Sequence, residues 1–428
     1  MSVDLSSIAT LGLVDSITLV MSGLFLLVVL SYYVVLILPR RKDLTRMRFG
    51  SLTIIVPARN EAPYIAECLQ SLQRAAFSGR KQIIVVDDAS HDSTAAIAKL
   101  HGVEVLRNNR QLGKSASINR ALKRANGELI AIVDGDSIIA PDALMLLAKE
   151  LSKKNMGAAA AVVKVRNKSR FINPWVHLEL MYSSFIRSIL ARIDANTVTP
   201  GALSMYRREA LDTIGGFSVK GFSEDVDVAV RLLRSGYRVG FCDRAISETY
   251  MPETIKSFFR QRTRVARGLI NILKRHVQFN SALIDLYAMP LLMFTYVQSV
   301  IMGIITIYKV TSGYFLYFAD KGIYLSWDVV KFFIEWFSLI GFVKWTWNVF
   351  SGNEPLTIVA MIGIISTLLS YPLFLYAIVR YDKGLQLSHI IPFVFMFPYW
   401  LLLMLIYLIC MPEVFFKDQH NMWKKNEK

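Results

Sequence analysis

The sequence predicts an α/β domain with a parallel, doubly wound β-sheet, inserted among helices that span a membrane. Two observations support this fold class. Short apolar strands alternate with helices from Leu52 to Val133, which is typical of parallel sheets with right-handed crossovers. Long apolar runs lie near both ends of the 428-residue chain, and hydrophobic residues make up 54% of it. That fraction is too high for an ordinary soluble protein.

The first apolar run, Ile17–Leu38, contains no charged residue and is long enough to cross a bilayer as a helix. Basic residues follow it, beginning at Arg40, Arg41 and Lys42. This order predicts an anchor whose N-terminus lies outside and whose following domain is cytoplasmic. It does not fit a cleaved signal peptide, which would carry its positive charge before the apolar run.

Three later apolar segments are also predicted to span the membrane, at Leu286–Tyr308, Leu356–Val379 and Ile390–Met411. A fourth, Trp327–Phe350, carries a polar stripe, so it either spans with the stripe inward or lies on the outer surface. The basic C-terminal tail, with Lys417 and three further lysines, favours spanning, because the tail then ends in the cytoplasm. We therefore expect five spans in a protein of the cell membrane.

The net charge of +16 does not indicate a nucleic-acid partner. The basic residues gather beside the apolar runs, where they suit anionic lipid headgroups, so membrane lipids are the expected partner. The three cysteines, Cys68, Cys242 and Cys410, are scattered, and their spacing indicates neither a disulfide scaffold nor a zinc site.

Between the spans, the repeated strand–helix pattern defines the α/β domain. The pattern predicts a domain division at residues 1–47 (anchor), 48–253 (α/β domain), 254–280 (basic amphipathic helix at the membrane surface) and 281–428 (C-terminal spans). Strands are expected at Leu52–Val56, Gln82–Val86, Val103–Leu106 and Leu129–Val133, and helices at Glu61–Ala76, Ser115–Asn126, Pro174–Ile193, Gly221–Ser235 and Thr254–His276. The apolar stripe of Pro174–Ile193 suits either ordinary core or the membrane surface.

Acidic residues follow several of these strands. Asp134 and Asp136, separated by Gly135, come directly after the strand Leu129–Val133. Ligands of open α/β sheets bind at the carboxyl ends of strands, and carboxylates there suit Mg²⁺ or Mn²⁺ bridged to phosphate. The alternative interpretation is a surface turn, because Asp and Gly are common turn residues.

Further side chains are expected at the same edge of the sheet. Asp88 follows the second strand and can accept a hydrogen bond from a base or a ribose, unless Asp87–Ser90 only turns the chain and caps a helix. Glu61 follows the first strand and can reach the same ligand. Lys114, at the start of a helix, is well placed for a phosphate.

Two sets of residues lie further along the chain. Glu224 and Asp225 lie at the start of a helix, where their negative charges interact favourably with the helix dipole whatever their role. Asp225 is also a candidate general base if it faces the ligand. Gln261, Arg262 and Arg264 lie on the basic helix. The two arginines do not share a helix face, so one can contact lipid while the other reaches a diphosphate, and a purely membrane-facing helix is the alternative.

Taken together, these motifs resemble the membrane-integrated family 2 glycosyltransferases, such as the hyaluronan, chitin, cellulose and poly-N-acetylglucosamine synthases. The resemblance covers roughly residues 50 to 275 and the flanking spans. The matching motifs are Pro57-Ala58-Arg59-Asn60-Glu61, Val86-Asp87-Asp88-Ala89-Ser90 (with Ala where Gly is usual), Asp134-Gly135-Asp136, Thr199-Pro200-Gly201-Ala202, Tyr206-Arg207-Arg208, Glu224-Asp225 and Gln261-Arg262-Thr263-Arg264-Val265.

The resemblance implies a GT-A fold and the transfer of a sugar from a nucleotide-sugar, expected to be UDP-linked, with inversion of the anomeric carbon. It assigns the nucleotide and its diphosphate to Pro57, Asn60, Glu61, Asp88, Lys114, Asp134, Gln261, Arg262 and Arg264. It assigns a Mg²⁺ or Mn²⁺ ion to Asp136 with Asp134, and the base to Asp225 beside Glu224.

Two departures bear on the acceptor. Val265 stands where the family has a Trp that stacks on the acceptor sugar, and Tyr250 stands where Glu is usual. We expect the extension of a glycan. The alternative, which Val265 favours, is the transfer of one sugar to a lipid carrier or glycolipid at the cytoplasmic face. A receptor or transporter with a degenerate nucleotide fold is disfavoured, because four acidic residues are intact: Asp88, Asp134, Asp136 and Asp225.

Overall fold

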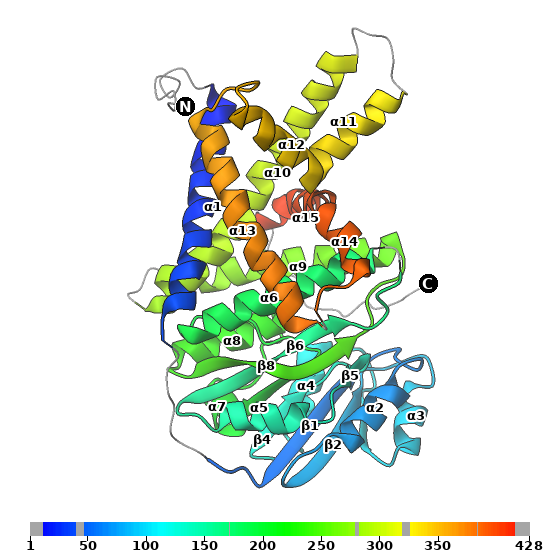
Figure 1. Ribbon diagram of the computed structural model, residues 1–428. Helices are drawn as coiled ribbons and strands as arrows, with labels where there is room; N and C mark the ends of the chain where they lie inside the picture. The colour runs from blue at the N-terminus through cyan, green and yellow to red at the C-terminus, as the bar shows by residue number, and fades with distance from the viewer. Residues whose placement is uncertain are drawn as a thin grey trace. The chain divides into compact units, whose positions relative to one another are not determined.

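The computed structural model describes residues 12–39, 47–170, 172–278, 282–318, 326–382 and 384–415. The chain divides into two compact units (Figure 1). The sheet unit comprises Leu38–Pro290 and Glu413–Lys428, and the helical unit comprises Met1–Ile37 and Leu291–Pro412. The basic residues 40–42 and the C-terminal lysines, on which the predicted orientation depends, lie outside the described residues.

The sheet unit alternates strands and helices along most of its length. Its strands are β1 (Ser51–Ala58), β2 (Arg80–Asp87), β3 (Glu104–Arg107), β4 (Leu129–Ile132), β5 (Ser137–Ile139), β6 (Met156–Val165), β7 (Ser204–Arg207) and β8 (Arg238–Thr249). Its helices are α2 (Ile65–Arg74), α3 (Thr94–Leu100), α4 (Lys114–Leu122), α5 (Ala143–Leu151), α6 (Asn173–Arg192), α7 (Arg208–Thr213), α8 (Glu224–Arg234), α9 (Ile255–His276) and a π-helical turn at Ile284–Ala288.

The strands form one sheet in the order β3-β2-β1-β4-β7-β6-β8-β5. The four strands predicted from the sequence, β1 to β4, are parallel, as expected. The expectation of a wholly parallel sheet is wrong, because β7 runs antiparallel to β4 and β6, and β5 runs antiparallel to β8. The strand–helix alternation stops at β4, which β5 follows through a turn at residues 134–137, and mixed sheets of this kind are common.

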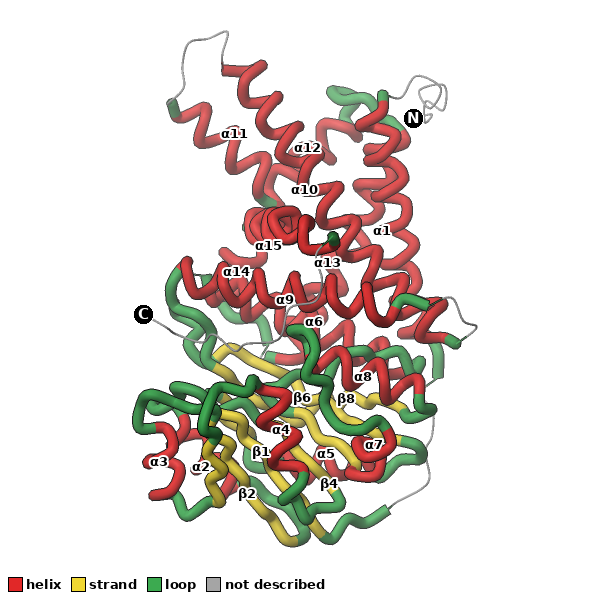
Figure 2. Tube along the Cα trace, turned by 180° about the vertical axis from the view of Figure 1, so that it is seen from behind, coloured by secondary structure: helices red, strands yellow, loops and turns green. Residues whose placement is uncertain are grey.

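Helices cover both faces of the sheet (Figure 2). Successive side chains of a strand point to opposite faces. In β1, Ile54 and Val56 therefore join the core under α2, α3 and α5, while Ile55 joins the core under α4, α7 and α8. This three-layer arrangement buries β1 and β4 on both sides, and it fixes the strand ends on which the candidate site is built.

The helical unit consists of α1 (Leu13–Ile37), most of α10 (Met289–Phe318), α11 (Trp327–Phe337), α12 (Leu339–Phe350), α13 (Ile358–Tyr381), α14 (Leu387–Val394) and α15 (Met396–Cys410). Helix α1 runs beside α13 in both views, and the Tyr33 hydroxyl donates a hydrogen bond to the Leu369 carbonyl at 2.8 Å. Among the described residues, four helices are long and apolar enough to cross a membrane: Leu13–Ile37, Ile284–Phe318, Ile358–Tyr381 and Met396–Val414.

The expectation of a fifth span at Trp327–Phe350 is wrong. This segment divides at Ser338 into α11 and α12, of 11 and 12 residues, whereas a span needs roughly 20. The Ser338 hydroxyl accepts a hydrogen bond from the Gly341 N–H and caps α12. The predicted span Ile390–Met411 is likewise broken at Phe395, where α14 ends and α15 begins.

Candidate functional site

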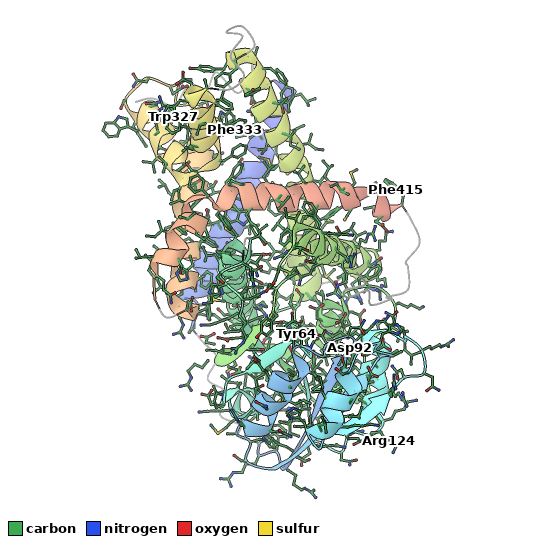
Figure 3. The ribbon with its side chains drawn as sticks, turned by 90° about the vertical axis from the view of Figure 1, so that its right-hand side faces the viewer. Tyr64, Asp92, Arg124, Trp327, Phe333 and Phe415 are labelled. Carbon is green, nitrogen blue, oxygen red and sulfur yellow. The ribbon has the colours of Figure 1, made fainter. Side chains whose placement is uncertain are left out.

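The candidate site lies where the parallel strands end. Figure 3 labels Tyr64 and Asp92, which follow β1 and β2, at one edge of the sheet unit, and Arg124, which precedes β4, at the opposite edge. The Asp134–Gly135–Asp136 motif follows β4, so it lies at the same edge as Tyr64 and Asp92. This is the edge at which open α/β sheets bind ligands.

Lys114 joins two of the predicted motifs. Its Nζ lies 2.6 Å from Asp134 Oδ1 and 3.0 Å from Glu224 Oε1. Burial alone would lower the pKa of Lys114, but the charges of Asp134 and Glu224 outweigh it and raise the pKa, so the ammonium stays charged. Residues 114, 134 and 224 are far apart in the sequence, and this ion pair brings the Asp134–Gly135–Asp136 motif and the acidic pair to one place.

Gly201 makes room for this ion pair. A Cβ at position 201 would meet the Lys114 ammonium and would lie 2.8 Å from Asp134 Oδ2. The Gly201 carbonyl also accepts a hydrogen bond from the Asp134 N–H at 3.0 Å. The motif Thr199–Ala202, identified only by resemblance, therefore packs directly against Asp134.

Asp225 is the second residue of α8 and is partly exposed. Its Oδ1 accepts a hydrogen bond from the Val226 N–H at 3.0 Å, and its carbonyl accepts one from the Thr199 hydroxyl at 2.8 Å. Burial and the neighbouring Glu224 charge raise the pKa of Asp225 from 3.8 to about 6, although Lys114 opposes them. A carboxylate with this pKa is ionised at neutral pH and is a stronger base than a solvated aspartate.

Asp136 and Glu61 lie beside Asp134. The Thr249 hydroxyl, at the end of β8, donates a hydrogen bond to Asp136 Oδ1 at 3.1 Å. Glu61 packs against the motif from the other side, since a Cβ on Gly135 would lie 3.1 Å from Glu61 Cγ.

The pKa of the Cys68 thiol is affected by the same carboxylates. Burial raises the pKa of this thiol, and the negative charges of Asp136, Asp134 and Glu61 raise it further. These charges make the end of β4 negative. Carboxylate oxygens are the ligands that Mg²⁺ and Mn²⁺ prefer, so the residue types at positions 134 and 136 fit such an ion.

Asp88 is buried and holds the segment that precedes Lys114. Its Oδ1 accepts hydrogen bonds from Asn108 Nδ2 at 2.7 Å and the Leu112 N–H at 2.8 Å, and its Oδ2 accepts one from the Gly113 N–H at 2.9 Å. Asp88 thereby fixes the start of α4. Its contact with a nucleotide stays a prediction.

The turns after β1 and β2 bind each other. The Asn60 N–H donates to Ser90 Oγ at 3.0 Å, and Asn60 Oδ1 accepts from the His91 N–H at 2.9 Å. Ala89 has φ of +54°, in the left-handed region that favours glycine, which explains why Gly is usual there. Pro57 is a buried residue of β1, paired with Val86 of β2. The roles of Pro57 and Asn60 at the nucleotide stay predictions.

The basic helix α9 places its predicted residues differently. Arg262 forms a two-pronged ion pair with Glu179 of α6, at 2.8 and 2.6 Å. Gln261 Nε2 contacts Met251 Sδ at 3.7 Å. Arg264 is exposed, as is Val265, at 46%. Their predicted contact with the diphosphate is therefore not visible in these side-chain positions and stays a prediction.

A small pocket, with a cavity volume of about 10 Å³, lies beside the Lys114 ion pair. Sequence reasoning did not identify Phe217 and Ile118 as part of this site. A signal for Phe217 exists, since it follows two glycines and precedes the helix that carries the acidic pair. The lining residues are Lys114, Ile118, Ile132, Thr199, Gly201, Tyr206, Phe217, Glu224 and Asp225.

Comparisons with known proteins bear on the fold and the family. The family model described as Glycosyl transferase family 2 matches residues 53–215. An N-acetylglucosaminyltransferase of Neorhizobium galegae is 32% identical over 248 residues, which are 54% of this chain and 57% of that protein. A poly-beta-1,6-N-acetyl-D-glucosamine synthase of Staphylococcus epidermidis is 27% identical over 233 residues, which are 52% of this chain and 56% of that protein. The alignments thus span just over half the length of these curated relatives.

Among solved structures, the mannosyltransferase PcManGT from Pyrobaculum calidifontis, in complex with GDP-Man and Mn²⁺, has a TM-score of 0.58. It is 20% identical, and the match covers 83% of this chain and 98% of that chain. Similarity at this identity shows the fold alone. The α/β domain is therefore GT-A-like, and the predicted fold class is confirmed.

Proposed function

We propose, from the match of residues 53–215 to the model described as Glycosyl transferase family 2, that the protein is an inverting membrane glycosyltransferase. It transfers N-acetylglucosamine from a UDP-linked donor to a growing glycan. The observation that carries the proposal is the Lys114 ion pair, in which Asp134 of the donor-side motif and Glu224 of the acidic pair meet.

On the donor side, Asp136 and Asp134 would hold a divalent cation, which would supply positive charge to the diphosphate. The negative charge that Asp134, Asp136 and Glu61 place at the end of β4 supports this assignment. Pro57, Asn60, Glu61 and Asp88 line the nucleotide, and Lys114 contributes its ammonium to a phosphate. Gln261 with Arg262 or Arg264 contacts the diphosphate once the donor is bound.

On the acceptor side, Asp225 takes the proton of the attacking hydroxyl. The acceptor oxygen bonds to the anomeric carbon on the face opposite the nucleotide, and the bond from that carbon to the diphosphate oxygen breaks. A single displacement of this kind inverts the anomeric configuration. The raised pKa of Asp225 supports its role as the base.

The donor sugar is proposed from the names of the relatives, which are an N-acetylglucosaminyltransferase and a poly-N-acetylglucosamine synthase. The four long apolar helices support a protein of the cell membrane, with the sheet unit in the cytoplasm and in contact with lipid. The proposed domain division keeps the bounds 1–47, 48–253, 254–280 and 281–428. Transfer of a single sugar to a lipid-linked acceptor is the second candidate, which the exposed Val265 favours.

The test uses the purified full chain with UDP-N-acetylglucosamine, UDP-glucose or GDP-mannose, each with Mn²⁺, Mg²⁺ or EDTA. Release of free nucleotide and product size are both read. UDP release from UDP-N-acetylglucosamine that requires the cation, together with a ladder of long products, supports the proposal. A single lipid-linked sugar selects the second candidate, and no release from any donor contradicts both.

A further inference from the structure

The segment before the proposed base is rich in glycine and needs outside support. Asp225 follows a loop, residues 214–223, in which Gly215, Gly216 and Gly221 all have positive φ. Glycine loses more conformational freedom on folding than any other residue. Tertiary contacts must therefore hold this loop if Phe217 and Asp225 are to keep their places at the pocket.

The first half of the loop is held from α8 and α4. Arg231 donates hydrogen bonds to the carbonyls of Ile214 at 2.7 Å and Gly216 at 2.8 Å. The Asn119 side chain of α4 binds both backbone groups of Phe217. Its Oδ1 accepts a hydrogen bond from the Phe217 N–H at 2.9 Å, and its Nδ2 donates one to the Phe217 carbonyl at 2.7 Å.

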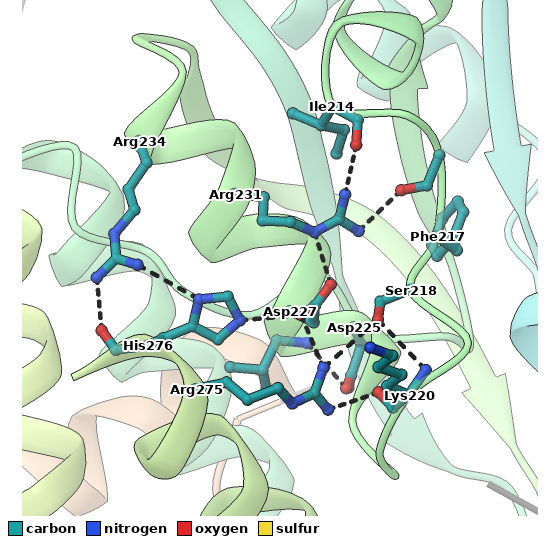
Figure 4. Close-up of polar contacts among 12 residues, drawn as sticks. Ile214, Phe217, Ser218, Lys220, Asp225, Asp227, Arg231, Arg234, Arg275 and His276 are labelled. Carbon is teal, nitrogen blue, oxygen red and sulfur yellow. Dashed lines mark hydrogen bonds and ion pairs between the residues drawn. The ribbon is translucent and has the colours of Figure 1, made fainter. Parts of the chain in front are cut away.

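The second half is held by α9. Arg275 Nη2 donates to the Lys220 carbonyl at 2.5 Å, and Nη1 lies 3.4 Å from Ser218 Oγ and 3.5 Å from Asp227 Oδ1 (Figure 4). A Cβ on Gly221 would collide with the Arg275 guanidinium. The guanidinium therefore lies directly on the loop backbone.

Helix α9 touches the loop at a second point, two turns earlier. A Cβ on Gly268 would collide with Ser223 Oγ, and Ser223 is the N-cap residue immediately before α8. Helix α9 therefore contacts this loop at two places: Arg275 lies against Lys220 and Gly221, and Gly268 lies against Ser223, two residues before Asp225.

Charge pairing fixes the end of α9 in this position. Asp227 is buried, and its carboxylate binds Arg231 at 2.7 Å and His276 Nε2 at 2.9 Å in addition to Arg275. Arg234 binds Asp285 at 2.7 Å and the His276 carbonyl at 2.5 Å. A buried carboxylate that loses one of its cations is costly, so the network resists any displacement of α9 from α8.

We propose that Arg275 and Gly268 of α9 are positioning residues for the acceptor-side reaction, which hold the loop 217–223 and thereby Phe217 and Asp225. The inference rests on the proposed function, and it adds that α9 serves both substrates. Its first half carries Gln261 and Arg262, which are proposed for the donor diphosphate, and its second half holds the segment of the acceptor base.

The pH dependence distinguishes positioning from a general structural role. Asp225 faces Glu224, Lys114 and Tyr206, and its raised pKa arises first from burial. If the loop relaxes, Asp225 becomes more exposed to water than it already is, and its pKa falls toward that of a solvated aspartate. The acid limb of kcat should then move below pH 6. A variant that only destabilises the fold would lower the amount of active enzyme without moving the limb.

The test compares Arg275→Gln and Gly268→Ala with Arg260→Gln, an exposed arginine on the same helix, as the matched control. The readouts are Mn²⁺-dependent binding of UDP-N-acetylglucosamine, kcat and KM for the acceptor, and the pH profile of kcat. We expect donor Kd within about twofold of the parent, kcat/KM lowered about 10- to 100-fold, and an acid limb shifted to lower pH. Arg275→Lys keeps the positive charge but not the planar guanidinium. It should therefore show a smaller loss of kcat/KM and a smaller shift of the acid limb than Arg275→Gln.

Two results would overturn the inference. One is an acid limb and kcat/KM equal to those of Arg260→Gln. The other is loss of donor binding in step with loss of transfer, which would indicate a general structural role. An inactive parent enzyme, by contrast, would count against the proposed function itself.

Discussion

Replacing Asp225 with Asn should stabilise the protein at neutral pH. The folded-state pKa of Asp225 is about 6, against 3.8 for a solvated aspartate. A carboxyl group with a raised pKa binds its proton more tightly when folded, so it contributes stability below pH 4 that is lost as the pH rises through 6. Above pH 6, the ionised Asp225 therefore opposes folding, and a neutral Asn at this position removes that cost.

The size of the effect follows from the shift in pKa. A difference of about 2 units corresponds to about 3 kcal/mol, which is an upper limit because Asp225 is partly exposed and Lys114 lies near its neighbour Glu224. Asn can still accept the hydrogen bond from the Val226 N–H. We expect a gain of about 1–3 kcal/mol, or roughly 3–10 °C in Tm for a unit of this size.

The assay is thermal unfolding of the purified full chain in one detergent, measured by intrinsic fluorescence at pH 7.5 and pH 5. The difference in Tm between Asp225→Asn and the parent should be positive at pH 7.5 and smaller at pH 5. Ser218→Ala, on the same loop, is the control and should show no such pH dependence. A variant less stable than the parent at pH 7.5, or a difference that does not change with pH, would refute the reasoning.

Three further variants probe the surroundings of Asp225. Lys114→Met leaves Asp134 and Glu224 close together without their cation, and it should lower the free energy of unfolding by about 2–4 kcal/mol, measured as a lower Tm. Gly201→Ala places a Cβ where the Lys114 ammonium lies, and nucleotide release should fall about 100-fold while the circular dichroism spectrum is unchanged. Ala89→Gly relieves a left-handed backbone and should raise stability by about 0.5–1 kcal/mol in the same thermal assay. Unchanged nucleotide release in Gly201→Ala would mean that Lys114 and Asp134 do not work at the reaction centre.

The sequence predicted the elements that have strong local patterns. Strands β1 and β4 are mostly apolar runs, and α9, which begins at Ile255, is preceded by Thr254, whose side chain accepts a hydrogen bond from the Ser257 N–H. Strand β6 escaped prediction because its centre is four consecutive alanines, which have a low preference for strands. Its burial on both faces depends on packing that no local pattern reveals.

The candidate site was predictable in part for the same reason. Motifs at strand ends, such as Asp134–Asp136, could be assigned to one edge because parallel strands end together. The pairing of Arg262 with Glu179 joins residues 83 positions apart on two helices and leaves no local signal. Hydropathy is similar on both sides of Ser338, so the helix break there has no hydropathy signal. The break depends on Ser338 and the nearby Gly341.

Transfer by the parent enzyme and by Asp225→Asn, each with radiolabelled UDP-N-acetylglucosamine and Mn²⁺, tests the central claim most directly. The parent should release UDP and build labelled glycan. Asp225→Asn should bind the donor with unchanged affinity and form no product. Product formation at the parent rate by Asp225→Asn, or loss of its donor binding, would contradict the account.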